Sequence, residues 1–172
     1  MALAFDASEK FGFDKPAGVA CRYLDRDFRC SIHDRRDALG FGGCAGYDCL
    51  GAGNRVTQSV FSGASWRDRP ELKSRMQNAF RAMRQVHRLL DLLVLAQKLP
   101  LNPSQAEERE NLLAALEPVG GWSETSLSGF ENGPVPDAVA HYLTRLDRAA
   151  EQMLARRAGG TGTVPAPHGS ET

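Results

Sequence analysis

The chain has 172 residues, 42% of them hydrophobic and 24% charged, which suits one folded domain that buries a core without covalent help. Its 21 basic residues equal its 21 acidic residues, so no overall field attracts nucleic acid, and we expect no nucleic-acid partner. Asp6, Glu9 and Lys10 interrupt the apolar run that a secretion signal requires. The most apolar stretch, residues 89–99, is too short to cross a membrane. We therefore expect a soluble cytoplasmic protein without a membrane partner.

Residues 1–20 show neither a helical nor a strand period, and Gly12 and Pro16 interrupt them, so we expect an irregular N-terminal arm. The segment 21–56 follows and contains all four cysteines of the chain. Glycines crowd its second half, which disfavours helix and predicts tight turns. In a reducing compartment, clustered cysteines hold metal or carry out redox chemistry more often than they form lasting disulfides. We therefore interpret residues 21–56 as a cysteine-rich metal module.

The candidate ligands are Cys21, Cys30, Cys44 and Cys49. Four thiolates suit both a structural zinc ion and an iron-sulfur cluster. No two cysteines have the two-residue spacing typical of zinc ribbons, so the spacing does not separate these two cofactors. His33 is a candidate additional ligand, or a hydrogen-bond donor to one. The alternatives are buried free thiols, a redox-active disulfide pair, and a nucleophilic pair of Cys30 with His33.

The remainder of the chain is predicted to be mostly helical. Residues 55–61 alternate weakly and predict a short strand or an extended link. Beyond Pro70, apolar residues recur every three or four positions to about Leu99, which predicts a long amphipathic helix. A second helix is predicted from Asn102, a capping residue followed by proline, to just before Pro118.

A third helix is predicted from about Pro136 to Gly159, and residues 158–172 have the composition of a disordered tail. We expect the two longer helices to pair as an antiparallel hairpin within a helical region of residues 57–157. The predicted fold class is therefore mainly α. It consists of a glycine-rich four-cysteine metal module docked on an antiparallel helical hairpin or bundle.

Several short motifs resemble a known bacterial module. Cys30-Ser31-Ile32-His33-Asp34-Arg35 and Gly43-Cys44-Ala45-Gly46-Tyr47-Asp48-Cys49 are similar to the cysteine-rich segment that precedes pentapeptide repeats in some bacterial proteins. Ser65-Trp66-Arg67 and Met83-Arg84-Gln85-Val86-His87 extend the resemblance over about residues 21–98. It implies an uncharacterised cysteine module attached to helices, with no established reaction, and the pentapeptide repeats are absent here.

A more distant resemblance concerns the run from Cys21 to Arg36, followed by Cys44 and Tyr47. It looks like part of a bacterial zinc- or iron-chelating cysteine-cluster family. This chain has His33 where that family has tyrosine and Arg36 where it has proline, and it lacks the family's earlier cysteine group.

Two functions of different classes follow from the sequence. The first is a metal-binding protein, with zinc or an iron-sulfur cluster held by the four cysteines in a structural or redox-sensing role. The alternative is a helical protein that binds an unknown protein partner and has structural cysteines and no catalytic activity. We assign no catalytic residue, because nothing in the sequence completes a thiol-based active site. The sequence leaves the oligomeric state open.

Overall fold

The computed structural model describes residues 3–159, and within them the chain is mainly helical, as predicted. Its β structure in this range consists of isolated antiparallel bridges. The helices are η1 (His33–Arg35), η2 (Gly42–Cys44), α1 (Ala52–Asn54), the π-helix η3 (Arg55–Val60), α2 (Leu72–Ala96), α3 (Pro103–Leu116), α4 (Glu124–Ser128) and α5 (Pro134–Gly159). The predicted tail falls outside the described residues, except for its first two positions, which belong to α5.

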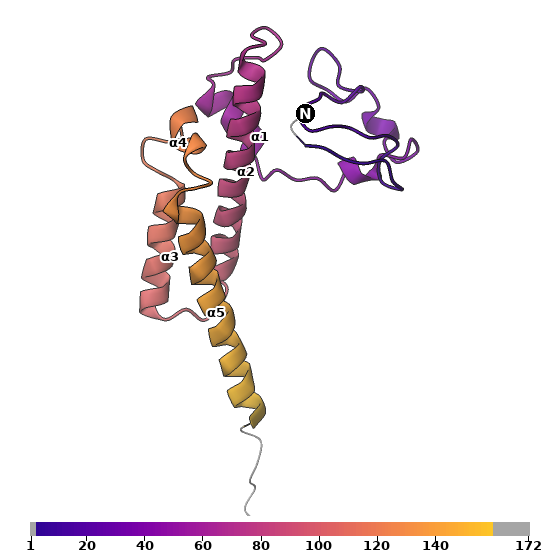
Figure 1. Cartoon of the computed structure of the whole chain (residues 1–172). Coiled ribbons are helices and arrows are strands. Elements are labelled where there is room, and N and C mark those ends of the chain that lie inside the picture. Colours follow the sequence, from indigo (N-terminus) through magenta and orange to yellow (C-terminus); the bar gives the residue numbers. More distant parts are fainter. Residues whose placement is uncertain (1–2, 160–172) are drawn as a thin grey trace, which may run out of the picture.

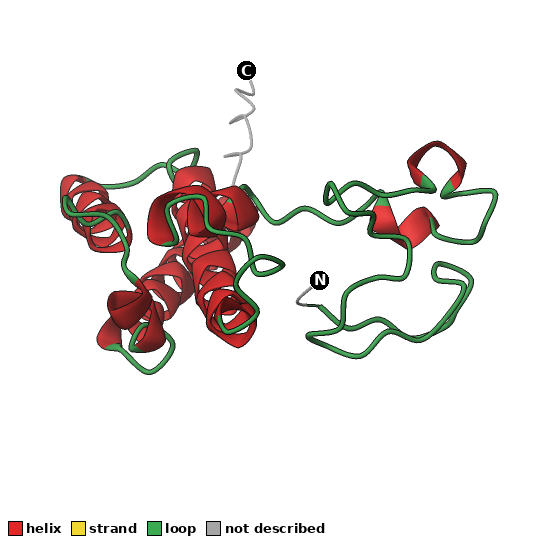
Figure 2. Cartoon of the chain, turned by 90° about the horizontal axis from the view of Figure 1, so that it is seen from above, coloured by secondary structure: helices red, strands yellow, loops and turns green. Residues whose placement is uncertain are grey.

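The chain forms two parts that stand side by side (Figures 1 and 2). We call residues 3–50 the N-terminal lobe and residues 51–159 the helical bundle. The lobe consists of loops, bridges and the short turns η1 and η2, whereas the bundle consists of α1–α5 and η3. No helix among residues 3–159 combines the length and the apolar character needed to cross a membrane.

Helix α2 is the central helix of the bundle. Its buried side chains recur at helical spacing and include Met76, Met83, Val86 and Leu93, so that one stripe faces the core. Helices α3, α4 and α5 all contact it, and an ion pair of 2.5 Å between Arg75 and Glu124 joins α2 to α4. The predicted long amphipathic helix is therefore confirmed.

Helix α3 begins where its capping residues predict. The Asn102 side chain accepts a 2.9 Å hydrogen bond from the Gln105 amide, and the Gln105 side chain accepts one of 2.9 Å from the Asn102 amide. This reciprocal arrangement satisfies two backbone donors that a helix start leaves unpaired. Pro103 then occupies the first turn, where its missing amide hydrogen costs nothing.

The pairing of the long helices differs from the prediction. Arg109 in the middle of α3 contacts Leu93 and Gln97 near the end of α2, whereas Glu117, just after α3, pairs with Arg55 of η3. Helix α3 is therefore the antiparallel partner of α2. Helix α5 then runs in the same direction as α2 (Figure 1). Because α3 lies between α2 and α5 in the sequence, the chain reverses direction twice between them. Helices α2 and α5 are therefore parallel.

The prediction of a strand or link at residues 55–61 is wrong. Val56 is buried in the same core as Ala52, one helical turn earlier. The Thr57 hydroxyl donates to the carbonyl of Gly53, which is compatible with a helical turn. Val56 and Val60 are four positions apart, and that separation fits a helix as well as a strand, so alternation was an ambiguous signal here.

The N-terminal arm folds back on itself and packs on the cysteine segment. Phe5 pairs with Lys15 through two backbone hydrogen bonds of 3.0 and 2.8 Å. The Phe13 ring lies 5.1 Å from that of Phe41 and 5.9 Å from that of Tyr23, measured between ring centres. These aromatic contacts give the lobe a small apolar core of its own.

Candidate functional site

A short hairpin carries Cys21 and Cys30. Leu24 and Cys30 form an antiparallel bridge, and the Leu24 amide donates a 3.0 Å hydrogen bond to the Cys21 carbonyl. At the tip, an Asp25 carboxylate oxygen accepts hydrogen bonds from the amides of Asp27 and Arg29 at 2.9 and 2.8 Å. This network closes the chain between the two cysteines and brings the ends of the segment together.

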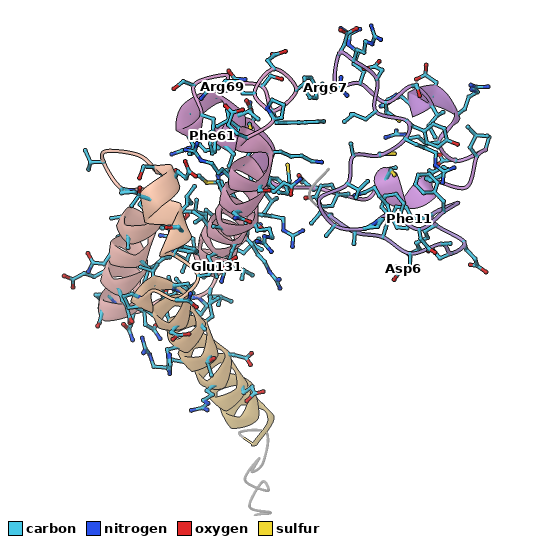
Figure 3. All side chains as sticks on the ribbon, turned by 45° about the horizontal axis from the view of Figure 1, so that its top comes forward. Asp6, Phe11, Phe61, Arg67, Arg69 and Glu131 are labelled. Carbon is cyan, nitrogen blue, oxygen red and sulfur yellow. The ribbon has the colours of Figure 1, made fainter. Side chains whose placement is uncertain are left out.

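Cys44 ends the glycine-rich turn η2. The Gly43 amide donates a 3.1 Å hydrogen bond to the Lys10 carbonyl, which fastens this turn to the N-terminal arm. A Cβ atom at Gly43 would lie only 2.5 Å from Cζ of Phe11, so no larger residue fits there without movement of the ring. Figure 3 labels Phe11 in the lobe. Close approach of the backbone thus fixes the position of Cys44.

Three of the four thiols share one electrostatic environment. Partial burial raises the pKa of Cys44, and negative charge at Cys21 and at Cys30 raises it further, while the Arg36 guanidinium opposes the shift. Burial lowers the pKa of Lys15, and negative charge at Cys21 opposes that shift. The turns of the lobe therefore bring Cys21, Cys30 and Cys44 within reach of one another's charge.

Cys21 and Cys44 also line an open cavity of about 840 Å³. Its other walls include the ammonium-bearing side chains Lys10 and Lys15 and, from the bundle, Phe80. Lys15 is buried, and its Nζ donates to the carbonyl of Val19 at 2.9 Å. The cavity therefore presents thiols together with cationic and aromatic groups.

Cys49 and His33 have other neighbours. Cys49 packs against the core of the helical bundle. Its Sγ would lie 3.9 Å from a Cβ atom added at Gly53. The His33 side chain is 64% exposed, and its Nδ1 lies 3.0 Å from a carboxylate oxygen of Asp34. Of the five predicted site residues, Cys21 and Cys30 influence the pKa of Cys44 through their charge.

All four cysteines are free thiols in the structure. Within residues 3–159, no three side chains of histidine, cysteine, aspartate or glutamate are arranged as a ready metal site. Sequence reasoning did not identify Lys15 as a neighbour of Cys21, because the arm shows no period. The charge of Arg36 acts on Cys44 in the structure and opposes the rise of its pKa.

Several contacts attach the lobe to the bundle. The Gln77 side chain donates a 2.9 Å hydrogen bond to the Gly18 carbonyl. His87 Nδ1 lies 2.5 Å from the carbonyl oxygen of Leu50, which accepts its proton. At the hairpin tip, Phe28 packs edge-on against Trp66, with ring centres 5.7 Å apart. The cysteine hairpin is thus connected directly to the segment before α2.

No family model matches this chain, and no solved structure matches it. Among curated proteins, it is similar to the uncharacterized protein YybG of Bacillus subtilis (strain 168), with 41% identity over 90 residues. The matched region is 52% of this chain and 32% of YybG, so the chain spans about a third of the length of that relative. The similarity establishes a related protein and supplies no activity.

Proposed function

We propose that the N-terminal lobe binds a thiophilic metal, either zinc or an iron-sulfur cluster, with Cys21, Cys30 and Cys44 as ligands. The observation that carries this proposal is the mutual influence of these three thiols, two of which line the same cavity. Thiolates that repel one another are stabilised together when a cation replaces their protons. The site then either fastens the lobe or senses redox state.

The three thiols leave one ligand of a four-coordinate site to be identified. Cys49 supplies the fourth thiolate if the loop of residues 45–48, which is exposed, moves it toward Cys44. His33 is the alternative, because it follows Cys30 by three residues in the exposed turn η1. Four-coordinate sites dominate structural zinc chemistry, so one of these two side chains completes the proposed site.

The resemblance to a bacterial cysteine module supports this proposal. The cysteine motifs resemble the module that precedes pentapeptide repeats, and we propose that this lobe is such a module. The four free thiols are compatible with a reducing cytoplasm, the compartment that we propose for the protein.

Metal analysis combined with a visible absorption spectrum of protein purified without air tests the proposal. Iron with sulfide and a brown colour identify a cluster, whereas one zinc per chain without colour identifies a zinc site. We expect Cys21→Ser, Cys30→Ser and Cys44→Ser each to lose most of the metal. Comparison of Cys49→Ser with His33→Ala identifies the fourth ligand. Wild-type protein that retains no metal after anaerobic purification and reconstitution contradicts the proposal.

We propose a second function, binding of a protein partner by the helices, on a separate observation. Val94, Leu95 and Leu99 near the end of α2 are 52%, 47% and 43% exposed. Clustered exposed apolar side chains mark interaction surfaces. The simplest partner is a second copy of the chain, so sedimentation of the wild type is compared with that of Leu95→Lys. A mass that rises with concentration only in the wild type supports this function, and equal monomer masses argue against it.

A further inference from the structure

Three arginines of α2 lie along a second cavity, distinct from the one that holds Cys21 and Cys44. Arg81, Arg84 and Arg88 follow the spacing of one helix face, and all three are exposed. The opposite face of the same turns carries the buried Ala82, Met83 and Val86 of the core. Burial of that face therefore fixes the direction of the three arginines.

The cavity has a volume of about 500 Å³ and lies where the lobe meets the bundle. Its lobe side consists of Asp48, Cys49 and Leu50, and Glu131 contributes from the connection between α4 and α5. Figure 3 labels Glu131 next to α2. The volume is within the range typical of sites for small molecules.

Two hydrogen bonds attach the Leu50 end of the lobe wall. The Leu50 carbonyl accepts the hydrogen bond of 2.5 Å from His87, which lies on α2 between Arg84 and Arg88. The Asp48 carboxylate accepts a 2.7 Å hydrogen bond from the Leu50 amide, so one of its oxygens already serves the backbone. The cavity is therefore built by the docked lobe and does not belong to α2 alone.

The guanidinium groups of the three arginines form no salt bridge with a carboxylate of the described residues. Among residues 3–159, no ion pair involves Arg81, Arg84 or Arg88, whereas Arg75 and Arg145 each pair with a glutamate. Arg81 Nη2 donates to the Asn78 side chain at 2.7 Å, which leaves its charge without a carboxylate. Guanidinium groups without carboxylates along one wall of a cavity favour an anionic ligand.

We infer that this cavity binds a small molecule that carries linked phosphoryl groups, held by Arg81, Arg84 and Arg88. The Cα atoms of these residues extend over about 10 Å of helix at ~1.5 Å per residue, which gives room for the two linked groups of a diphosphate. Guanidinium groups bind phosphate oxygens through two parallel hydrogen bonds each. Cys21, Cys30 and Cys44 do not line this cavity, so the arginines can be substituted without changing those three thiols. Cys49, a candidate fourth ligand, does line it.

Isothermal titration of the full chain with pyrophosphate tests the inference. We expect Arg84→Gln with Arg88→Gln to weaken binding at least about tenfold, because two charge-assisted contacts are lost. Arg148→Gln is the matched control, since Arg148 is also exposed on a helix but does not line this cavity. It should bind pyrophosphate as the wild type does. Circular dichroism and melting curves verify that each variant is folded.

Two further arms make the test decisive. Citrate carries similar charge on carboxylates, and we expect it to bind at least about tenfold more weakly than pyrophosphate. Pyrophosphate also chelates metals, but heat from metal extraction would persist in the arginine variants because their thiols are unchanged. Equal binding of citrate, equal binding by the double variant, or no binding at millimolar pyrophosphate would overturn the inference.

Discussion

The guanidinium carbon of Arg67 lies 4.3 Å from the centre of the Phe28 ring, which places a cation from the bundle against the tip of the cysteine hairpin (Figure 3). Arg67 is also 5.3 Å from the Trp66 ring centre, and its Nη2 donates to the Leu24 carbonyl at 3.5 Å. Its Nη1 is buried and has no hydrogen-bond partner among the described residues. The aromatic contact therefore offsets part of the cost of burying this cation.

The first prediction concerns this contact. Phe28→Ala removes both the cation–π contact and the edge-on contact with Trp66, which are worth about 1 kcal/mol together with wide variation. We expect the emission of Trp66 to shift to the red as water reaches it, measured in a Trp122→Phe background. Phe28→Tyr keeps a ring at the same place and should keep the wild-type emission. An unchanged spectrum in Phe28→Ala would show that the contact does not hold the hairpin.

A second prediction uses two glycines of the same loop. Gly43→Ala places a Cβ 2.5 Å from the Phe11 ring, and that ring stacks on Phe5 at 4.4 Å, so it cannot move freely. We expect the variant to loosen the turn that holds Cys44, so that this thiol reacts faster with a thiol reagent. Gly46→Ala is the control, because no atom lies within 4 Å of an added Cβ there. Equal reaction rates in the two variants would contradict the role of this close approach.

A third prediction concerns the titration of Cys44 in metal-free protein. Burial is the main cause of its raised pKa, and the charges of Cys21 and Cys30 add to it. We expect Cys21→Ser to lower the pKa of Cys44 and Arg36→Gln to raise it. The pH dependence of alkylation, resolved by mass spectrometry of the peptide that contains Cys44, measures both shifts. A pKa that neither substitution moves would remove the electrostatic basis of the proposed site.

The same shift has a consequence for stability. Because the folded state holds the Cys44 proton more tightly than the unfolded chain does, its contribution is complete below the ordinary thiol pKa. It is lost as the pH rises through the higher pKa of the folded state. Metal-free protein should therefore unfold more easily in this alkaline range, and Cys44→Ser should reduce that dependence. Urea unfolding curves across this range measure the effect.

A fourth prediction concerns Arg109, which is 5% exposed. Its Nε donates to the Leu93 carbonyl at 2.8 Å, its Nη2 donates to the Gln97 side chain at 3.0 Å, and its Nη1 pairs with Glu110. We expect Arg109→Met to lower the free energy of unfolding by about 2–4 kcal/mol, because the buried Leu93 carbonyl loses its donor and the other two contacts are lost with it. Urea unfolding measures the loss. The exposed Arg148→Met should change stability by less than about 0.5 kcal/mol.

Local signals explain which parts of the fold the sequence predicted. The start of α3 was predictable because Asn102, Pro103 and Gln105 make their capping contacts within four residues. The helical conformation of residues 55–61 was not predictable, because the spacing of Val56 and Val60 fits both a helix and a strand. The buried Ala52, which shares their helical face, precedes the segment. Helix α4 was missed because it is only five residues long, although Ser123 caps it through the Ser126 amide.

The site was predictable in composition and not in geometry. Clustering identified the four cysteines, but which thiols meet depends on the bridge of Leu24 with Cys30 and on the hydrogen bond from Gly43 to Lys10. Neither contact has a signature in residue spacing. Cys49 is only five positions after Cys44 in the chain, yet it packs on the bundle. Proximity in sequence therefore did not predict that Cys49 packs on the bundle core.

Phe28 and Leu50 are both in the left-handed backbone region, with φ of 62° and 52°. Residues other than glycine are uncommon in this region. Each is also a point of attachment to the bundle, Phe28 by its ring and Leu50 by its carbonyl. Such a conformation costs about 1–3 kcal/mol and persists only when surrounding contacts enforce it. Local hydrogen bonds to Asp25 and Asp48 also hold the amides of these two residues. The lobe therefore contacts the bundle at two places where the backbone conformation is itself costly.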